Sequence, residues 1–255
     1  MYGLGELRTP GTLQTRSMGG VGVGMRNAAA VNLLNPAAYS AVRPKSFLFD
    51  FGLEGQCFYN SQKYYGQTLN TSYYTVNFHD IAFQLPIAKH LGLGFSLTPY
   101  SSVGYRMKQE VDDDEIWGNI GRVQYQWDGD GDVTEVKLGL GWEIFRGFSI
   151  GIAAQYYWGD IQRIYKTAIL ENITGGGLIA DATGTETYSV SRFKGQFGVQ
   201  WSPISNRRRI LTIGATYDIG GDLNPNVTTK VQTGDIFNTV AMDLSLIHIS
   251  EPTRP

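Results

Sequence analysis

The chain has 255 residues, a formal net charge of -2 at pH 7 and only 17% charged residues. It is long enough to bury a substantial core, and its charge offers no overall attraction for nucleic acid. Its 32 glycines and 15 tyrosines favour a β-rich protein with many turns over a helical bundle, because glycine destabilises helices and tyrosine suits a pleated surface. We therefore expect an all-β fold and no nucleic-acid partner.

Cysteines and histidines are too few and too scattered for a structural zinc site. The chain has one cysteine, Cys57, and three histidines, His79, His90 and His248. No apolar run is long enough to predict a transmembrane helix, and the first residues lack the basic and apolar regions of a signal peptide. No cofactor is expected.

The first feature in chain order is an N-terminal segment, residues 1–45, without regular alternation of apolar and polar residues. It begins with a serine and a series of glycines: Ser17, Gly19, Gly20, Gly22 and Gly24. Further on, Asn35 followed by Pro36 predicts a helix N-cap with proline at the first helical position. A short turn of helix through Ala37 and Ala38 should follow. The glycines do not match a dinucleotide-binding motif, because no predicted strand precedes them.

From residue 46 to 243, apolar and polar residues alternate, as in strands with one apolar and one polar face. Phe47, Phe49 and Phe51 begin the pattern at every second position. The phase is lost near Asp80, which predicts a β-bulge. The predicted strands number about eight: 47–59, 73–87, 91–106, 133–144, 148–158, 188–201, 209–217 and 236–243.

The connections between these strands alternate in length. Short turns are predicted at 88–90, 145–147 and 202–208. Long polar loops are predicted at 60–72, 108–132, 159–187 and 218–235. Short periplasmic turns and long extracellular loops are typical of an outer-membrane β-barrel. The pattern therefore favours an antiparallel transmembrane β-barrel in the cell outer membrane of a Gram-negative bacterium, with outer-membrane lipids as partners.

Aromatic residues lie near both ends of the predicted strands. Those beside the short turns are Trp142, Phe145, Phe148 and Trp201. Those toward the opposite ends are Tyr105, Tyr156, Trp158 and Tyr217. Two such girdles are typical of membrane-spanning strands. Charged residues on the other face, including Glu135, Lys137 and Lys194, suit a water-filled interior. The alternative is a soluble all-β binding protein with aromatic residues in its core.

The stretch from Ser17 to Gly24, followed by Asn35-Pro36-Ala37 and then a barrel, resembles the FadL-type long-chain fatty-acid transporters of Gram-negative outer membranes. The resemblance implies an N-terminal hatch in residues 1–45 that plugs a fourteen-stranded barrel. It implies passive transport of hydrophobic or amphipathic small molecules, and assigns the residues named above as hatch elements. A hatch-bearing barrel that serves as a non-transporting subunit of an outer-membrane assembly or secretion complex is the alternative.

A closed barrel of eight strands has no room for a hatch, because side chains fill its interior. We therefore expect an open, curved sheet with strands 47–59 and 236–243 unpaired with each other. Residues 244–255 match the in-frame translation of a sequencing-library adapter, so we interpret them as a non-native tail and residues 46–243 as a partial barrel. By the same reasoning, Met1 is interpreted as an internal methionine of a longer precursor.

The predicted loop 108–132 contains two acidic clusters. Asp128, Asp130 and Asp132 match the opening of a calcium-binding loop, but Gly139 stands where a bidentate glutamate is needed. We interpret them as a solvated loop tip and a weak calcium candidate, together with residues 112–115. No metal site is expected otherwise.

The basic run Arg207 to Arg209 lies at a predicted short turn and should keep that turn in water or contact lipid headgroups. No Gly-x-Ser-x-Gly motif and no nucleophile paired with a base stand out in the sequence. We therefore do not expect an enzyme.

Overall fold

The computed structural model describes residues 5–64, 67–110, 121–172, 182–205, 209–233 and 236–242. They form one antiparallel sheet with the strand order β10-β9-β7-β6-β5-β4-β3-β2, to which β1 is joined through β4 and β8 through β7. The strands are β1 (Glu6–Leu7), β2 (Leu48–Tyr64), β3 (Gln67–Ala88), β4 (Leu91–Glu110), β5 (Gly121–Phe145), β6 (Phe148–Asn172), β7 (Ala182–Ser205), β8 (Ile210–Ile219), β9 (Asn226–Thr233) and β10 (Ile236–Met242). The predicted all-β, barrel-like fold class is confirmed.

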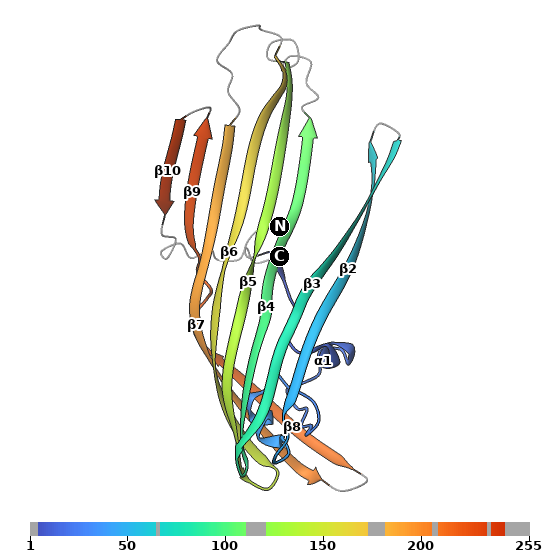
Figure 1. Ribbon diagram of the computed structural model, residues 1–255, viewed down its shortest axis with the longest axis vertical. Coiled ribbons are helices and arrows are strands. Elements are labelled where there is room, and N and C mark those ends of the chain that lie inside the picture. Colours follow the sequence, from blue (N-terminus) through green and yellow to red (C-terminus); the bar gives the residue numbers. More distant parts are fainter. Residues whose placement is uncertain are drawn as a thin grey trace, which may run out of the picture.

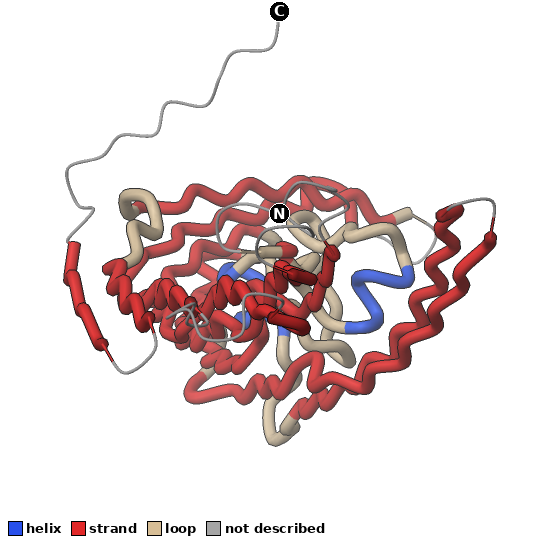
Figure 2. The backbone as a smooth tube through the Cα atoms, turned by 90° about the horizontal axis from the view of Figure 1, so that it is seen from above, coloured by secondary structure: helices blue, strands red, loops and turns tan. Residues whose placement is uncertain are grey.

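The sheet curls around the N-terminal segment as a half-barrel (Figure 2). This segment contains helix α1 (Leu13–Ser17) and the 3-10 helix η1 (Pro36–Ala41). Among the described residues β2 pairs only with β3 and β10 only with β9, so no ladder joins the two edges, as expected. In the same part of the chain, no helix is both long and apolar enough to cross a membrane.

The strands are much longer than predicted, and the sheet is correspondingly tall (Figure 1). β5 and β6 have 25 residues each, whereas about 9–11 residues cross a bilayer. The predictions of long loops at 60–72, 108–132 and 159–187 were therefore wrong in part, because all three contain strand. Their sequences lack the clear alternation of apolar and polar residues that predicts a strand.

The predicted loop 218–235 also contains strand. β8 pairs with the lower part of β7 as far as Gly195 opposite Ile219, and β9 pairs with the upper part from Ser189 opposite Asn226. The two strands follow one line along β7, interrupted by residues 220–225. This interruption contains two glycines and ends in a proline, which lacks the N–H group needed for a sheet ladder.

The outward face of the lower sheet is an apolar belt. Between the base and the level of Trp158, the outward positions of the described strands carry no Asp, Glu, Lys, Arg or His. On β6 the belt runs from Phe148 to Trp158, about ten residues or roughly 33 Å along the strand. With the usual tilt of about 40°, this length gives a height of about 25 Å, which matches the apolar band of outer-membrane barrels.

Two predicted details of the strands have different outcomes. The predicted bulge is confirmed at His79, where the register shifts between Gly52 opposite Asp80 and Leu53 opposite Phe78. The assignment of Tyr105 to an outward aromatic girdle was wrong. A register shift between Pro99 and Ser101 reverses the phase of β4, so Tyr105 packs against the inward cluster of Val103, Val133, Tyr157, Ile161 and Val190.

Candidate functional site

The inner face of the lower sheet carries rows of glycine that receive the N-terminal segment. Gly92, Gly141, Gly151 and Gly198 are successive partners across β4, β5, β6 and β7, and Gly94 opposite Gly139 forms a second row. We call these six residues the glycine cradle. A side chain on this surface would meet η1, so the cradle lets η1 lie directly on the sheet backbone.

Contacts with the cradle involve the Asn-Pro-Ala-Ala-Tyr stretch. A Cβ added at Gly151 would overlap the backbone of Pro36 and Ala37, and one added at Gly141 would lie 2.9 Å from the amide nitrogen of Ser40. The ring of Tyr39, only 1% exposed, covers the second row. Burial raises the pKa of Tyr39, so its phenol stays neutral.

Asn35 links η1 to the sheet and to the glycine-rich stretch. Its side-chain oxygen accepts a bond from the amide of Ala37 at 3.0 Å, which confirms the predicted N-cap. Its side-chain nitrogen donates to the carbonyl oxygens of Val23 at 2.8 Å and Val199 at 3.1 Å. The residue is completely buried. Asn35 therefore fixes both the start of η1 and its position against β7.

Further amides bind the glycine-rich stretch. Asn32 donates to the carbonyl oxygens of Gly22 at 2.7 Å and Met25 at 2.8 Å. Gln200 on β7 donates to Val23 at 3.0 Å and Met25 at 3.1 Å. A Cβ at Gly22 would collide with Leu34, and one at Gly24 would approach β8. Glycine at these two positions therefore permits close packing against Leu34 and β8.

The remaining glycines of the predicted hatch end helix α1. Ser17 is its last residue, and Gly19 and Gly20 both have positive φ, 78° and 80°. Their amides donate to the carbonyl oxygens of Arg16 and Thr15, each at 2.9 Å. Helices commonly end at a residue with positive φ, and glycine adopts this conformation without a steric penalty.

Two sets of ion pairs hold the N-terminal segment at different places. Arg26 donates to the hydroxyls of Ser149 at 2.6 Å and Ser40 at 3.1 Å, and lies 3.5 Å from Glu143 at the base of β5. Nearer α1, Arg16 pairs with Glu54 of β2 at 2.9 Å, and Arg8 reaches the same carboxylate at 3.4 Å. The segment is thus tied to several strands of the sheet.

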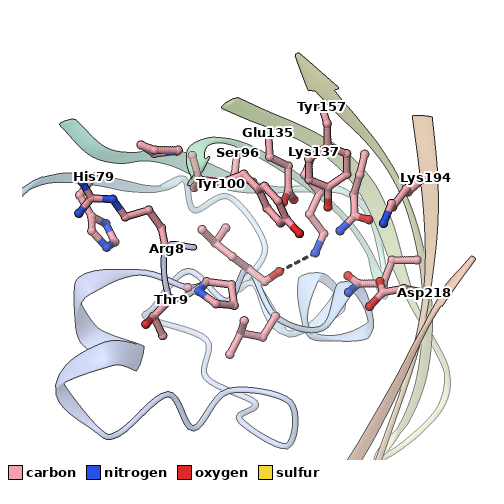
Figure 3. Close-up of a pocket in the computed structure, with 18 of the residues that line it drawn as sticks. Arg8, Thr9, His79, Ser96, Tyr100, Glu135, Lys137, Tyr157, Lys194 and Asp218 are labelled. Atoms are coloured by element: carbon pink, nitrogen blue, oxygen red, sulfur yellow. Dashed lines mark hydrogen bonds between the residues drawn. The ribbon is translucent and has the colours of Figure 1, made fainter. Parts of the chain in front are cut away.

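A cavity of about 370 Å³, lined by both charged and apolar side chains, lies between the N-terminal segment and the sheet. Figure 3 shows Lys194 and Asp218 on one side, Arg8 and His79 on the other, and Lys137 pointing from the sheet toward the segment. Glu135 and Tyr157 also line it. The sequence-based expectation of charged residues in the interior agrees with these positions.

Lys137 is the buried cation of this cavity. Only 4% of it is exposed, and its ammonium donates to the carbonyl oxygen of Leu33 at 2.7 Å (Figure 3).

We predict that Lys137→Met lowers the free energy of unfolding by about 2 kcal/mol, because Leu33 loses its donor in a buried site. Lys194→Met is the control, since its ammonium makes no hydrogen bond or ion pair to the described residues and lies 5.7 Å from the ring of Tyr157. Thermal unfolding in detergent measures both; equal losses would contradict the prediction.

The acidic residues considered for calcium lie on a strand rather than a loop tip. Asp128, Asp130 and Asp132 all face outward from β5. The carboxylate of Asp128 forms an ion pair with Arg106 at 3.0 Å, rather than a metal site with its acidic neighbours. Within the described ranges, no group of three potential metal ligands comes together. Residues 112–115, Arg207, Arg208 and the segment 244–255 lie outside the described residues.

Sequence reasoning missed the glycine cradle, Gln200 and Arg26. The signal available was a glycine at every second position of neighbouring strands on the polar face, as at Gly92 and Gly94 and again at Gly139 and Gly141. A residue that is neither apolar nor hydrophilic on an inward face indicates close approach of another backbone.

Comparison with known families decides between the two interpretations of a hatch-bearing barrel. The BamG family model matches residues 1–252. The chain belongs to the BamG family. This family is linked to the outer-membrane β-barrel assembly machinery, BAM, and thus to the outer membrane. No curated protein and no solved structure matched the chain.

The family match corrects the resemblance drawn from Ser17 to Gly24 and Asn35 to Ala37. Assignment to the FadL-type transporters, and with it fatty-acid transport, was wrong, because the matching family is BamG. Of the motif residues, Gly24 and Asn35 to Ala37 contact the sheet. Gly22 packs against Leu34, and Ser17, Gly19 and Gly20 lie at the end of helix α1. The alternative of a subunit in an outer-membrane assembly complex agrees with the match.

Proposed function

We propose that this BamG-family protein is a membrane-embedded, non-transporting subunit of the outer-membrane β-barrel assembly machinery. The observation that carries the proposal is the family match over residues 1–252. In this role the apolar belt contacts lipid, the N-terminal segment is a fixed part of the fold, and the protein acts by binding other subunits rather than by catalysis.

The interior of the half-barrel supports a structural role better than passage of an alkyl chain. η1 is buried and is held on the cradle by Asn35 and Tyr39. The cavity beside it is lined by charged and polar groups such as Glu135, Lys137 and Asp218. An alkyl chain there would displace water from charged groups without replacing their hydrogen bonds, which is unfavourable.

Depletion of the protein in its native host tests the proposal. We expect the amounts of other folded outer-membrane β-barrels to fall several-fold, because their assembly loses a subunit, while uptake of long-chain fatty acids per folded transporter stays unchanged. Quantitative proteomics of outer membranes and uptake of a labelled fatty acid measure the two effects. Normal levels of folded barrels after depletion would contradict the proposal. Re-expression of the wild-type chain is the control.

A further inference from the structure

A lysine or arginine stands at each described connection at the base of the sheet. Lys45 precedes β2, Lys89 lies in the β3–β4 turn, Arg146 in the β5–β6 turn and Arg209 directly before β8. Figure 1 shows these connections together at the lower end of the molecule. We call the four residues the basic rim. All four are exposed, and none forms an ion pair within the part of the chain that the structure describes.

Acidic residues do not neutralise this rim. The carboxylate nearest the turns, Glu143, is already engaged by Arg26 at 3.5 Å and His90 at 3.0 Å, and accepts a bond from the amide of Gly147. The exposed acidic residues Asp130 and Asp132 lie near the middle of β5, above the apolar belt. Among the described residues the rim is therefore a locally positive zone, although the whole chain has a net charge of -2.

Each cation of the rim lies next to the edge of the apolar belt. Exposed apolar side chains occur within two residues of every one of them: Phe47 at 62%, Ile87 at 51%, Phe145 at 58% and Ile210 at 75% exposure. A large apolar residue in the acyl region with a neighbouring Lys or Arg outside it is the arrangement found at the boundary between lipid tails and headgroups.

Spacing indicates what kind of anion the rim fits. Successive cations are separated by two strands, which places them about 10 Å apart around the base. They are too far apart to bind one phosphate together, but suit separate phosphates on an extended surface. We propose that the basic rim binds the headgroups of anionic phospholipids in the leaflet at the base of the sheet. Because short turns face the periplasm, this is the periplasmic leaflet.

Lipid selectivity in a reconstituted bilayer tests the proposal. The intact protein is placed in phosphatidylcholine nanodiscs with spin-labelled phosphatidylglycerol or phosphatidylcholine, and the fraction of label immobilised at the protein is compared. We expect preference for phosphatidylglycerol of several-fold at low ionic strength, largely lost at about 0.5 M salt through screening. In K45Q/K89Q/R146Q/R209Q the preference should fall to near one.

A matched control removes equal charge from the upper part of the molecule. In K63Q/K108Q/K166Q/K230Q four exposed lysines are replaced on β2, β4, β6 and β9, and the preference should remain. The heat-dependent gel mobility of all variants reports folding, and the single variants K89Q and R146Q give partial losses if the quadruple variant does not fold. The proposal is overturned if the rim variant keeps the preference for phosphatidylglycerol. It is also overturned if loss of the rim weakens binding of an acidic protein subunit but leaves the lipid preference unchanged.

Discussion

Replacement of Gly151 by valine is expected to detach η1 from the sheet and to destabilise the protein by about 3 kcal/mol. The added Cβ would overlap backbone atoms of Pro36 and Ala37, which cannot move aside as the end of a flexible side chain can. Valine itself suits a strand, so any loss arises from the contact with η1. Trypsin cleavage after Arg26 should accelerate, since the segment leaves the sheet, and thermal unfolding in detergent gives the stability.

Gly184→Val provides the matched control for the cradle. Gly184 is also a glycine of a long strand, β7, but a Cβ there meets no atom within 4 Å. We expect unchanged or slightly higher stability and no change in cleavage after Arg26. If Gly151→Val and Gly184→Val behaved alike, the cradle would not be what holds η1.

Asn35→Asp is expected to cause a second large loss, about 3 kcal/mol at pH 7. The substitution keeps the shape of the side chain but places a buried negative charge against the carbonyl oxygens of Val23 and Val199. Both lose the Asn35 donor, and Val23 keeps the bond from Gln200. Protonation restores one O–H donor, so the defect should diminish as the pH falls toward about 4. Unfolding in detergent as a function of pH measures this change.

Asn27→Asp is the control for this substitution. Asn27 is exposed, and its side-chain oxygen accepts a bond from the amide of Ala29 at 2.9 Å, a contact that a carboxylate also makes. Its replacement should therefore change stability by less than about 0.5 kcal/mol at either pH. If Asn35→Asp lost no more stability than Asn27→Asp, Asn35 would not be the residue that fixes η1 against the sheet.

Local chemistry made some of the site predictable from the sequence. Asn35 and Pro36 mark the start of η1 because an N-cap depends only on neighbouring residues. The apolar belt was predictable because a strand with one apolar and one polar face has a sequence period of two. The bulge at His79 could be found because it interrupts that period.

Other features depend on register and therefore could not be found from one sequence. Gly92, Gly141, Gly151 and Gly198 become a continuous row only when four strands are correctly aligned. The inward position of Tyr105 depends on a register shift some residues earlier. The upper parts of β5 and β6 carry little alternation, so the period of two did not predict them as strands. Likewise, a hatch-like motif does not show to which family of barrels a chain belongs. The match to the BamG family model was needed for that assignment.

Affinity purification of the tagged chain from detergent-solubilised outer membranes of its native host tests the central claim most directly. We predict recovery of the central barrel subunit of the assembly machinery in near-equal amount to the tagged chain, and no recovery with an unrelated tagged outer-membrane barrel. Recovery of the chain alone, or only with proteins unconnected to barrel assembly, would contradict it.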